Sequence, residues 1–300
     1  MAPTPLFDRS LLEARRRRAR RIGPATFLMD RAAEDFADRL APVLRRFDRA
    51  ADLGTPTGAV RAALAGNGAI GTMIAVEACS GDDAGEGGLR VVADVEALPF
   101  ADGALDLVVS AFALQTVNDL PGVLIQIRRA LKPDGLFLAA LLGGDTLAEL
   151  RESFAVAETE LEGGVSPRVA PFPDLRDMGA LLQRAGFALP VADVDRVVVR
   201  YPSPLALMAD LRRMGATNPL AERRRVPLRR ATLGRMMEVY ADRFRDPDGR
   251  IRASFDIIWL SGWAPHESQQ KPLRPGSARA RLADALGTRE LSAGEKPGRG

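Results

Sequence analysis

Short apolar runs recur through the middle of the chain, and Gly, Asp or Pro residues bound each of them. Runs of this kind predict buried strands, whereas the intervening stretches carry helical spacing or turn residues. Because the runs are continuously apolar instead of alternating, both faces of the strands should be covered, as in a parallel sheet flanked by helices. We expect strands at 50–53, 72–76, 89–93, 105–112, 136–142, 191–201 and 251–263.

Composition supports a globular α/β protein. The 300 residues are 46% hydrophobic and 27% charged, which excludes a disordered or fibrous chain. The longest apolar stretch is far shorter than the roughly 18 to 20 residues that a membrane helix needs. Cys79 is the single cysteine, so no disulfide and no cysteine-based metal cluster can form within one chain. This cysteine usage suits a reducing compartment.

The N-terminal region has the apolar spacing of an amphipathic helix. The spacing predicts one continuous helix over about 6–44, as a helical arm covering 1–46. An arginine cluster at 15–18, 20 and 21 lies on this arm, and we interpret it as a solvated face or a surface for an acidic partner. The basic clusters lack interleaved aromatic residues and no separate nucleic-acid-binding module is evident, so we expect no nucleic-acid partner.

The rest of the chain divides into segments that differ in composition and in the spacing of apolar residues. We predict a core domain over 47–265, with a helical insertion at 203–246 between the last two strands. Residues 266–300 are rich in Pro, Gly, Ser and Arg and have little to bury, so we expect a flexible tail there.

A glycine-bearing turn follows the first expected strand. Asp52 ends that strand, and Gly54 and Gly58 follow it. Such a turn at the carboxyl edge of a parallel sheet lets the backbone approach a nucleotide closely. Pro56 occupies the middle of the turn, and proline fixes φ near −65° and lacks an N–H group. If the loop needs a positive φ at that position, cofactor binding is weakened.

Two further acids end the next two strands. Glu77 lies about 20 residues after the turn, where a carboxylate can accept hydrogen bonds from both ribose hydroxyls. Asp94, followed by Val95, ends the third strand and is placed to contact an adenine ring. Acids at the ends of three successive strands predict a nucleoside site.

This arrangement resembles the class I S-adenosylmethionine-dependent methyltransferases. The later motifs of that superfamily are matched by Leu98-Pro99-Phe100, by the stretch at 105–110 and by Leu131-Lys132-Pro133-Asp134-Gly135. The resemblance implies a Rossmann-like α/β fold with a mostly parallel seven-stranded sheet and an antiparallel last strand. It also implies S-adenosylmethionine as cofactor, with Asp52, Gly54, Gly58, Glu77, Asp94 and Val95 as its binding residues.

A narrower resemblance covers almost the whole chain. It is similar to the family that includes the mitochondrial complex I assembly factor acting as an arginine hydroxylase. The matching segments are Phe7-Asp8-Arg9, 117–121, 143–151, 157–160, 163–167, 184–187 and 262–269. The resemblance implies modification of an arginine on a peripheral subunit of complex I. For a bacterial member it implies a cytoplasmic protein, with the inner membrane surface nearby and no transmembrane segment.

Two alternatives remain. One is a small-molecule or carrier-linked carboxyl O-methyltransferase, as in biotin synthesis, which shares the Asp94 and Leu98-Pro99-Phe100 pattern. The other is a non-catalytic assembly chaperone with a vestigial cleft. Pro56 favours the chaperone, as do the poor helix formers at 78–88. Thr116 stands where relatives commonly carry an aromatic residue, so a possible stacking partner beside the cofactor is missing.

The sequence identifies no catalytic residue. His266 is the only histidine and has no visible partner, so a site of two histidines and one carboxylate cannot form in one chain, and we expect no metal. Methyl transfer depends mostly on positioning the acceptor, so an acid–base pair is not required. The turn at 143–146 is a candidate acceptor contact, and its Asp145 is expected to cap the following helix.

Overall fold

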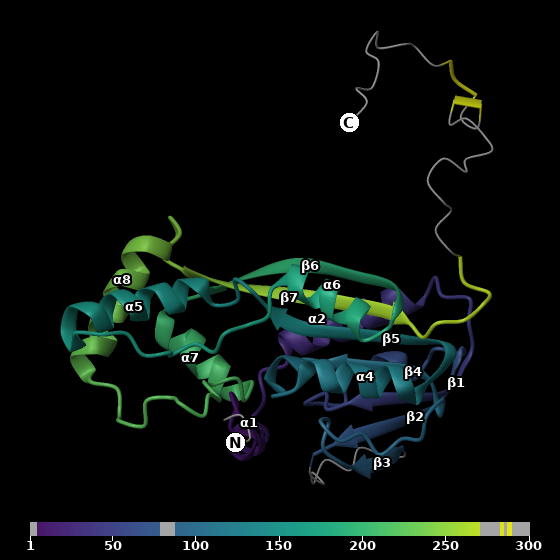
Figure 1. Cartoon of the computed structure of the whole chain (residues 1–300). Helices are drawn as coiled ribbons and strands as arrows, with labels where there is room; N and C mark the ends of the chain where they lie inside the picture. Colours follow the sequence, from purple (N-terminus) through teal and green to yellow (C-terminus); the bar gives the residue numbers. More distant parts are fainter. Residues whose placement is uncertain (1–4, 79–87, 271–282, 285–286, 290–300) are drawn as a thin grey trace, which may run out of the picture. The chain divides into compact units, whose positions relative to one another are not determined.

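The computed structural model describes residues 5–78, 88–270, 283–284 and 287–289. It contains two compact units, Met1–Pro265 and His266–Gly300, and the first holds every helix and strand discussed below (Figure 1). Cys79, most of the 78–88 crossover and most of the expected tail lie outside the described residues.

A seven-stranded sheet forms the centre of the first unit, with the order β3-β2-β1-β4-β5-β7-β6. β1 to β5 run parallel to one another, whereas β7 runs antiparallel to β5 and β6. The expected fold class, with an antiparallel last strand, is therefore confirmed. The strands are β1 (Phe47–Leu53), β2 (Ile70–Glu77), β3 (Leu89–Val92), β4 (Leu105–Ala111), β5 (Leu131–Gly143), β6 (Ala188–Tyr201) and β7 (Ile251–Trp263).

Helices cover both faces of this sheet. α4 and α6 pack on one face through residues such as Leu124 and Leu182, and α2 and α3 pack on the other through Phe36 and Leu64. Asp119 caps α4 by accepting from the Gly122 amide at 2.9 Å. The helices are α1 (Arg9–Arg21), α2 (Phe27–Leu40), α3 (Ala59–Leu64), α4 (Leu120–Ala130), α5 (Ala148–Glu162), α6 (Leu175–Arg184), α7 (Pro204–Arg213) and α8 (Arg230–Phe244).

The prediction of one continuous N-terminal helix is wrong. The chain forms α1 and α2 with a break between them, where Gly23 has φ +86° and Pro24 follows. Proline lacks the amide that a helix needs and disfavours helical geometry in the residue before it. α2 belongs to the core, because Phe36 packs edge-on against Trp259 with ring centroids 4.9 Å apart.

The region around α5, α7 and α8 forms a separate apolar cluster that includes Phe154, Leu207 and Met236 (Figure 1). The two family motifs at 157–160 and 163–167 meet here. Glu158 is fully buried and accepts from the Ser166 amide at 2.6 Å and from Arg168 Nε at 2.6 Å. These bonds fix the loop after α5 against the helix.

Asp145 does not cap α5, contrary to the expectation from sequence. Leu147 takes the N-cap position in the left-handed conformation, with φ +56°, and no side chain caps the helix. Asp145 instead pairs with Arg196 Nη2 at 2.7 Å, because β6 brings this arginine beside the turn.

Candidate functional site

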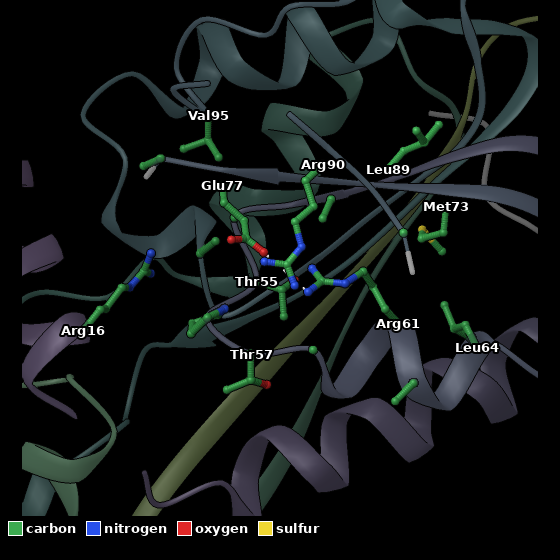
Figure 2. A pocket seen from close by; sticks show the side chains of 18 of the residues that line it. Arg16, Thr55, Thr57, Arg61, Leu64, Met73, Glu77, Leu89, Arg90 and Val95 are labelled. Carbon is green, nitrogen blue, oxygen red and sulfur yellow. Dashed lines mark ion pairs between the residues drawn. The ribbon is translucent and has the colours of Figure 1, made fainter. Parts of the chain in front are cut away.

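A cavity of about 1180 Å³ opens beside the carboxyl ends of β1 and β2 (Figure 2). The strand order changes direction between β1 and β4, and ligands of open α/β sheets bind at such a point. Of the six predicted cofactor-binding residues, Gly54, Gly58, Glu77 and Val95 line the cavity. Asp52 and Asp94 lie outside its lining.

Gly54 makes the sharp turn that begins the loop. It has φ +67°, and its amide donates to the Val76 carbonyl at 2.8 Å. A Cβ atom at this position would lie 2.8 Å from Val95 Cγ1 and 3.1 Å from Ala113 Cβ. Both the backbone conformation and the close packing therefore require glycine.

Pro56 lies two residues after this turn. Its φ is not positive, as the proline ring requires, so this loop has no left-handed residue at that position. Gly58 also has an ordinary φ of −79° and serves as the N-cap residue of α3. Gly54 supplies the left-handed turn of this loop, and the expected effect of Pro56 on cofactor binding stays a prediction.

Asp52 lies beneath the loop and is fully buried. It accepts from the Thr55 hydroxyl and, at 3.2 Å, from Arg61 Nη1. Burial raises the pKa of Asp52 to about 6, although the bonds from Thr55 and Arg61 oppose this rise. Asp52 thus fixes the loop and the first turn of α3 from below.

Glu77 ends β2 and faces the cavity. Its Oε1 lies 3.4 Å from Arg61 Nη2, so Arg61 bridges the two predicted acids, Asp52 and Glu77. Figure 2 shows Arg61 and Arg90 pointing their guanidinium groups toward the Glu77 carboxylate. Neither arginine was predicted from the sequence, because no motif marks them.

Asp94 is held by the N-terminal helix. Its Oδ1 accepts from Arg9 Nη2 at 2.8 Å, and Arg9 Nη1 donates to Glu96 at 2.5 Å. The adjacent Val95 is buried and lines the cavity. Arg9 belongs to the Phe7-Asp8-Arg9 segment that resembles the family, but its contact with Asp94 was not predicted from the sequence.

A second cavity of about 410 Å³ adjoins the first. The two share lining residues from α1, from the glycine-bearing loop and from η1 (Leu114–Thr116), among them Arg16, Arg20, Thr57 and Thr116. Thr116 donates its hydroxyl to the Ala113 carbonyl at 2.9 Å. A molecule in the second cavity would therefore lie next to one in the first.

Other candidate residues lie elsewhere. In the 143–146 turn, Asp145 does not line the second cavity, but the flanking Leu142 and Leu147 do. His266 belongs to the second unit, where its Nδ1 lies 2.7 Å from Ser268 Oγ. Within the described residues, no group of three His, Cys, Asp or Glu side chains could hold a metal ion. Nor is any described helix long and apolar enough to cross a membrane.

Solved structures and a family model identify the fold. Residues 51–139 match the family model described as a methyltransferase domain. A candidate methyltransferase from Bacillus halodurans is similar over 78% of this chain and 99% of its own, with a TM-score of 0.53 and 16% identity. The YcgJ protein from Bacillus subtilis has a TM-score of 0.52 at 17% identity, over 79% of this chain and 99% of its own. The fold is that of the methyltransferases.

Curated relatives extend the similarity to nearly the whole chain. The mitochondrial arginine-hydroxylase NDUFAF5 of Homo sapiens is 41% identical over 91% of this chain and 81% of its own, and that of Danio rerio is 36% identical over 93% and 89%. A malonyl-[acyl-carrier protein] O-methyltransferase from Laribacter hongkongensis is 42% identical over 62% of this chain and 60% of its own. The chain has a methyltransferase domain and belongs to the NDUFAF5 arginine-hydroxylase family.

Proposed function

We propose that this chain is a S-adenosylmethionine-dependent enzyme whose cofactor occupies the first cavity. The observation that carries the proposal is the open cavity at the carboxyl edge of the sheet, with the Glu77 carboxylate facing it. Its volume of about 1180 Å³ exceeds what a nucleoside with an amino-acid side chain needs. Glu77, Gly54 and Val95 together fit such a group.

The proposed roles of the residues follow from their placement. Glu77 accepts hydrogen bonds from the ribose hydroxyls, and one contact of Arg61 with Glu77 gives way when they bind. Gly54 and Val95 form the packed wall behind the nucleoside. When bound, S-adenosylmethionine supplies a methyl group activated by a sulfonium. The chain's own contribution is to orient the acceptor and to exclude water.

For Asp94 the contacts favour a structural role over the contact with adenine that the resemblance implies. Its carboxylate is bound to Arg9, so contact with adenine would require Arg9 to release it or to share it. Arg9 ties α1 to the loop after β3, and α1 also lines both cavities. We therefore propose that Asp94 holds the N-terminal helix beside the cofactor.

The biological role proposed here comes from the family. We propose that the chain assists the assembly of respiratory complex I in the bacterial cytoplasm by modifying a protein, with an arginine of a peripheral subunit as the acceptor that the family implies. Deletion of the gene, followed by native electrophoresis of complex I, tests this role. Loss of assembled complex supports it, and normal assembly contradicts it.

A carboxyl O-methyltransferase is the second candidate. The similarity to the malonyl-[acyl-carrier protein] enzyme covers 62% of this chain, whereas that to the arginine-hydroxylase of Homo sapiens covers 91%. The specific observation in its favour is the charge of the second cavity, which is lined by seven arginines and, among the described residues, by no Asp or Glu. The non-catalytic chaperone is less favoured, because the described residues leave the first cavity open.

Calorimetric titration with S-adenosylmethionine tests the cofactor site. We expect the wild-type chain to bind and Glu77→Ala to bind at least about tenfold more weakly, since a hydrogen bond to a charged group contributes about 1.5–3 kcal/mol. Glu34→Ala removes an exposed carboxylate of α2 and serves as the matched control. Absence of binding by well-folded wild-type protein would favour the chaperone.

A further inference from the structure

A third cavity of about 850 Å³ adjoins the second one. The first and third cavities share no lining residue, so the second cavity lies between them. The second and third cavities share residues of α5 and of the loop between α5 and α6, which are Phe154, Arg168, Val169, Pro171 and Phe172.

The third cavity is mostly apolar and opens at the surface. Leu6 and Val165 line it and are 51% and 61% exposed. Its charged lining residues include Arg151 and Glu222, which carry opposite signs. Large apolar side chains that stay exposed beside a cavity are typical of a surface that binds an apolar group of a partner.

Hydrogen bonds fix both sides of this third cavity. On one side, the Ala221 amide donates to the Leu6 carbonyl at 2.9 Å. On the other side, the buried Glu158 accepts from Arg168 Nε at 2.6 Å and from the Ser166 hydroxyl at 2.7 Å. A cavity whose walls are already fixed loses little conformational entropy when a ligand binds.

The second cavity, by contrast, is strongly positive. Four of its arginines pair with carboxylates that do not line it, as Arg168 does with Glu158. Arg15 and Arg20 on α1 form no ion pair with a described carboxylate, and Arg15 Nη1 donates to the Thr217 carbonyl at 2.8 Å. No Asp or Glu lines this cavity in the part of the chain that the structure describes. The arginines that line it are Arg15, Arg16, Arg20, Arg168, Arg213, Arg223 and Arg224.

We propose that the second and third cavities bind one extended segment of a protein acceptor, which carries an acidic side chain near the modified residue and an apolar side chain further along. This inference rests on the proposed function, because it places the modified residue beside a cofactor in the first cavity. The acidic side chain pairs with the arginines of the second cavity, since guanidinium groups bind a carboxylate with two parallel hydrogen bonds. The apolar side chain occupies the third cavity beside Leu6 and Val165.

The acidic side chain also makes room for an arginine acceptor. A guanidinium brings a permanent positive charge into a cavity that already has seven lining arginines. Like charges repel more strongly as water leaves the cavity, so an isolated arginine would bind poorly there. A carboxylate on the same segment offsets this repulsion and gives specificity for the segment. We therefore expect the segment, and not the acceptor side chain alone, to be recognised.

A peptide library tests the proposal. Each peptide has a fixed central arginine with randomised residues on both sides. The library is displayed on phage and selected on the full-length protein, once without cofactor and once with S-adenosylhomocysteine. We expect Asp or Glu to be enriched at least about fivefold near the arginine, and large apolar residues to be enriched further along the peptide. Enrichment of Lys or Arg near the central arginine, or no enrichment at all, overturns the proposal.

Substitutions in the two cavities assign the two parts of the segment. Val165→Ser should weaken the binding of a selected peptide about fivefold in fluorescence anisotropy, because its apolar side chain loses a contact. Val226→Ser is the matched control, since Val226 is also 61% exposed and lines none of the three cavities.

For the charge, Arg20→Gln removes one lining guanidinium and should weaken the same peptide about fivefold. Arg17→Gln, at an exposed position of the same helix outside the cavity lining, should change the affinity less than about twofold, because an exposed charge is screened. Equal weakening by a control and its cavity variant overturns the proposal, since the effect would then not come from the cavities.

The cofactor titration separates this proposal from the proposed function. A peptide preference of the predicted kind, in a protein that fails to bind S-adenosylmethionine, supports the segment site and contradicts the cofactor site. Normal S-adenosylmethionine binding with no acidic or apolar preference does the reverse.

Discussion

Substitution of Gly54 by alanine tests the loop that borders the first cavity. An alanine at φ +67° pays the cost of the left-handed conformation, about 1–2 kcal/mol. Its Cβ would also lie 2.8 Å from Val95 Cγ1, and overpacking of this kind costs about 1–3 kcal/mol. We therefore expect Gly54→Ala to lower the free energy of unfolding by about 2–5 kcal/mol.

A double-mutant cycle separates the two costs. Val95→Ala alone should cost about 2 kcal/mol, because Val95 is buried. In the double variant the contact between the two side chains is relieved, so the loss should be smaller than the sum of the two single losses by about 1–3 kcal/mol. The conformational cost at Gly54 remains.

Urea unfolding followed by the fluorescence of the two tryptophans, Trp259 and Trp263, gives each free energy. The control is Gly144→Ala, since a Cβ there has no neighbour within 4 Å and φ is not in the left-handed region. Additivity of the two substitutions within about 0.5 kcal/mol would refute the packing argument. A loss below about 0.5 kcal/mol for Gly54→Ala would refute the conformational argument as well.

Three further substitutions have defined outcomes. Pro56→Gly should lower the free energy of unfolding by about 0.5–1 kcal/mol, through the entropy of the unfolded chain, and should not strengthen S-adenosylmethionine binding in calorimetry; stronger binding would show that the proline strains the loop. For Asp52, the raised pKa means that the carboxyl favours the folded state below about pH 4 and loses this contribution as the pH rises through about 6. The free energy of unfolding of wild type minus that of Asp52→Asn should thus fall by about 3 kcal/mol across this window in urea titrations, and a flat difference would contradict the burial argument. Glu158→Ala should cost about 3–5 kcal/mol in the same assay because Arg168 loses its buried partner, whereas a loss below about 1 kcal/mol would show that water or another group replaces it.

The positions of the strands along the sequence could be predicted because they depend on local patterns. Continuous apolar runs mark strands buried on both faces, and Glu77 was placed at a strand end because the run stops there. The break between α1 and α2 also had a local signal, the Gly23-Pro24 pair, but the apolar spacing on either side concealed it. The apolar spacing therefore predicted one helix, although the Gly23-Pro24 pair is typical of a turn.

Long-range contacts could not be predicted in the same way. Arg9 reaches Asp94 across 85 positions, and no residue pattern encodes that distance. Arg61 bridges Asp52 and Glu77 because α3 begins immediately after the glycine-bearing loop, which depends on the turn at Gly54. The charge of the second cavity likewise arises from three separate regions of the sequence. Only the folded chain brings these arginines to one wall.

A crystal structure of the full chain with S-adenosylhomocysteine tests the central claim most directly. We predict that the ribose hydroxyls lie within hydrogen-bonding distance of the Glu77 carboxylate, with the nucleoside packed beside Val95 and the side chain of Arg61 moved from Glu77. A nucleoside bound elsewhere, or a first cavity filled by the protein's own side chains under saturating ligand, would contradict it.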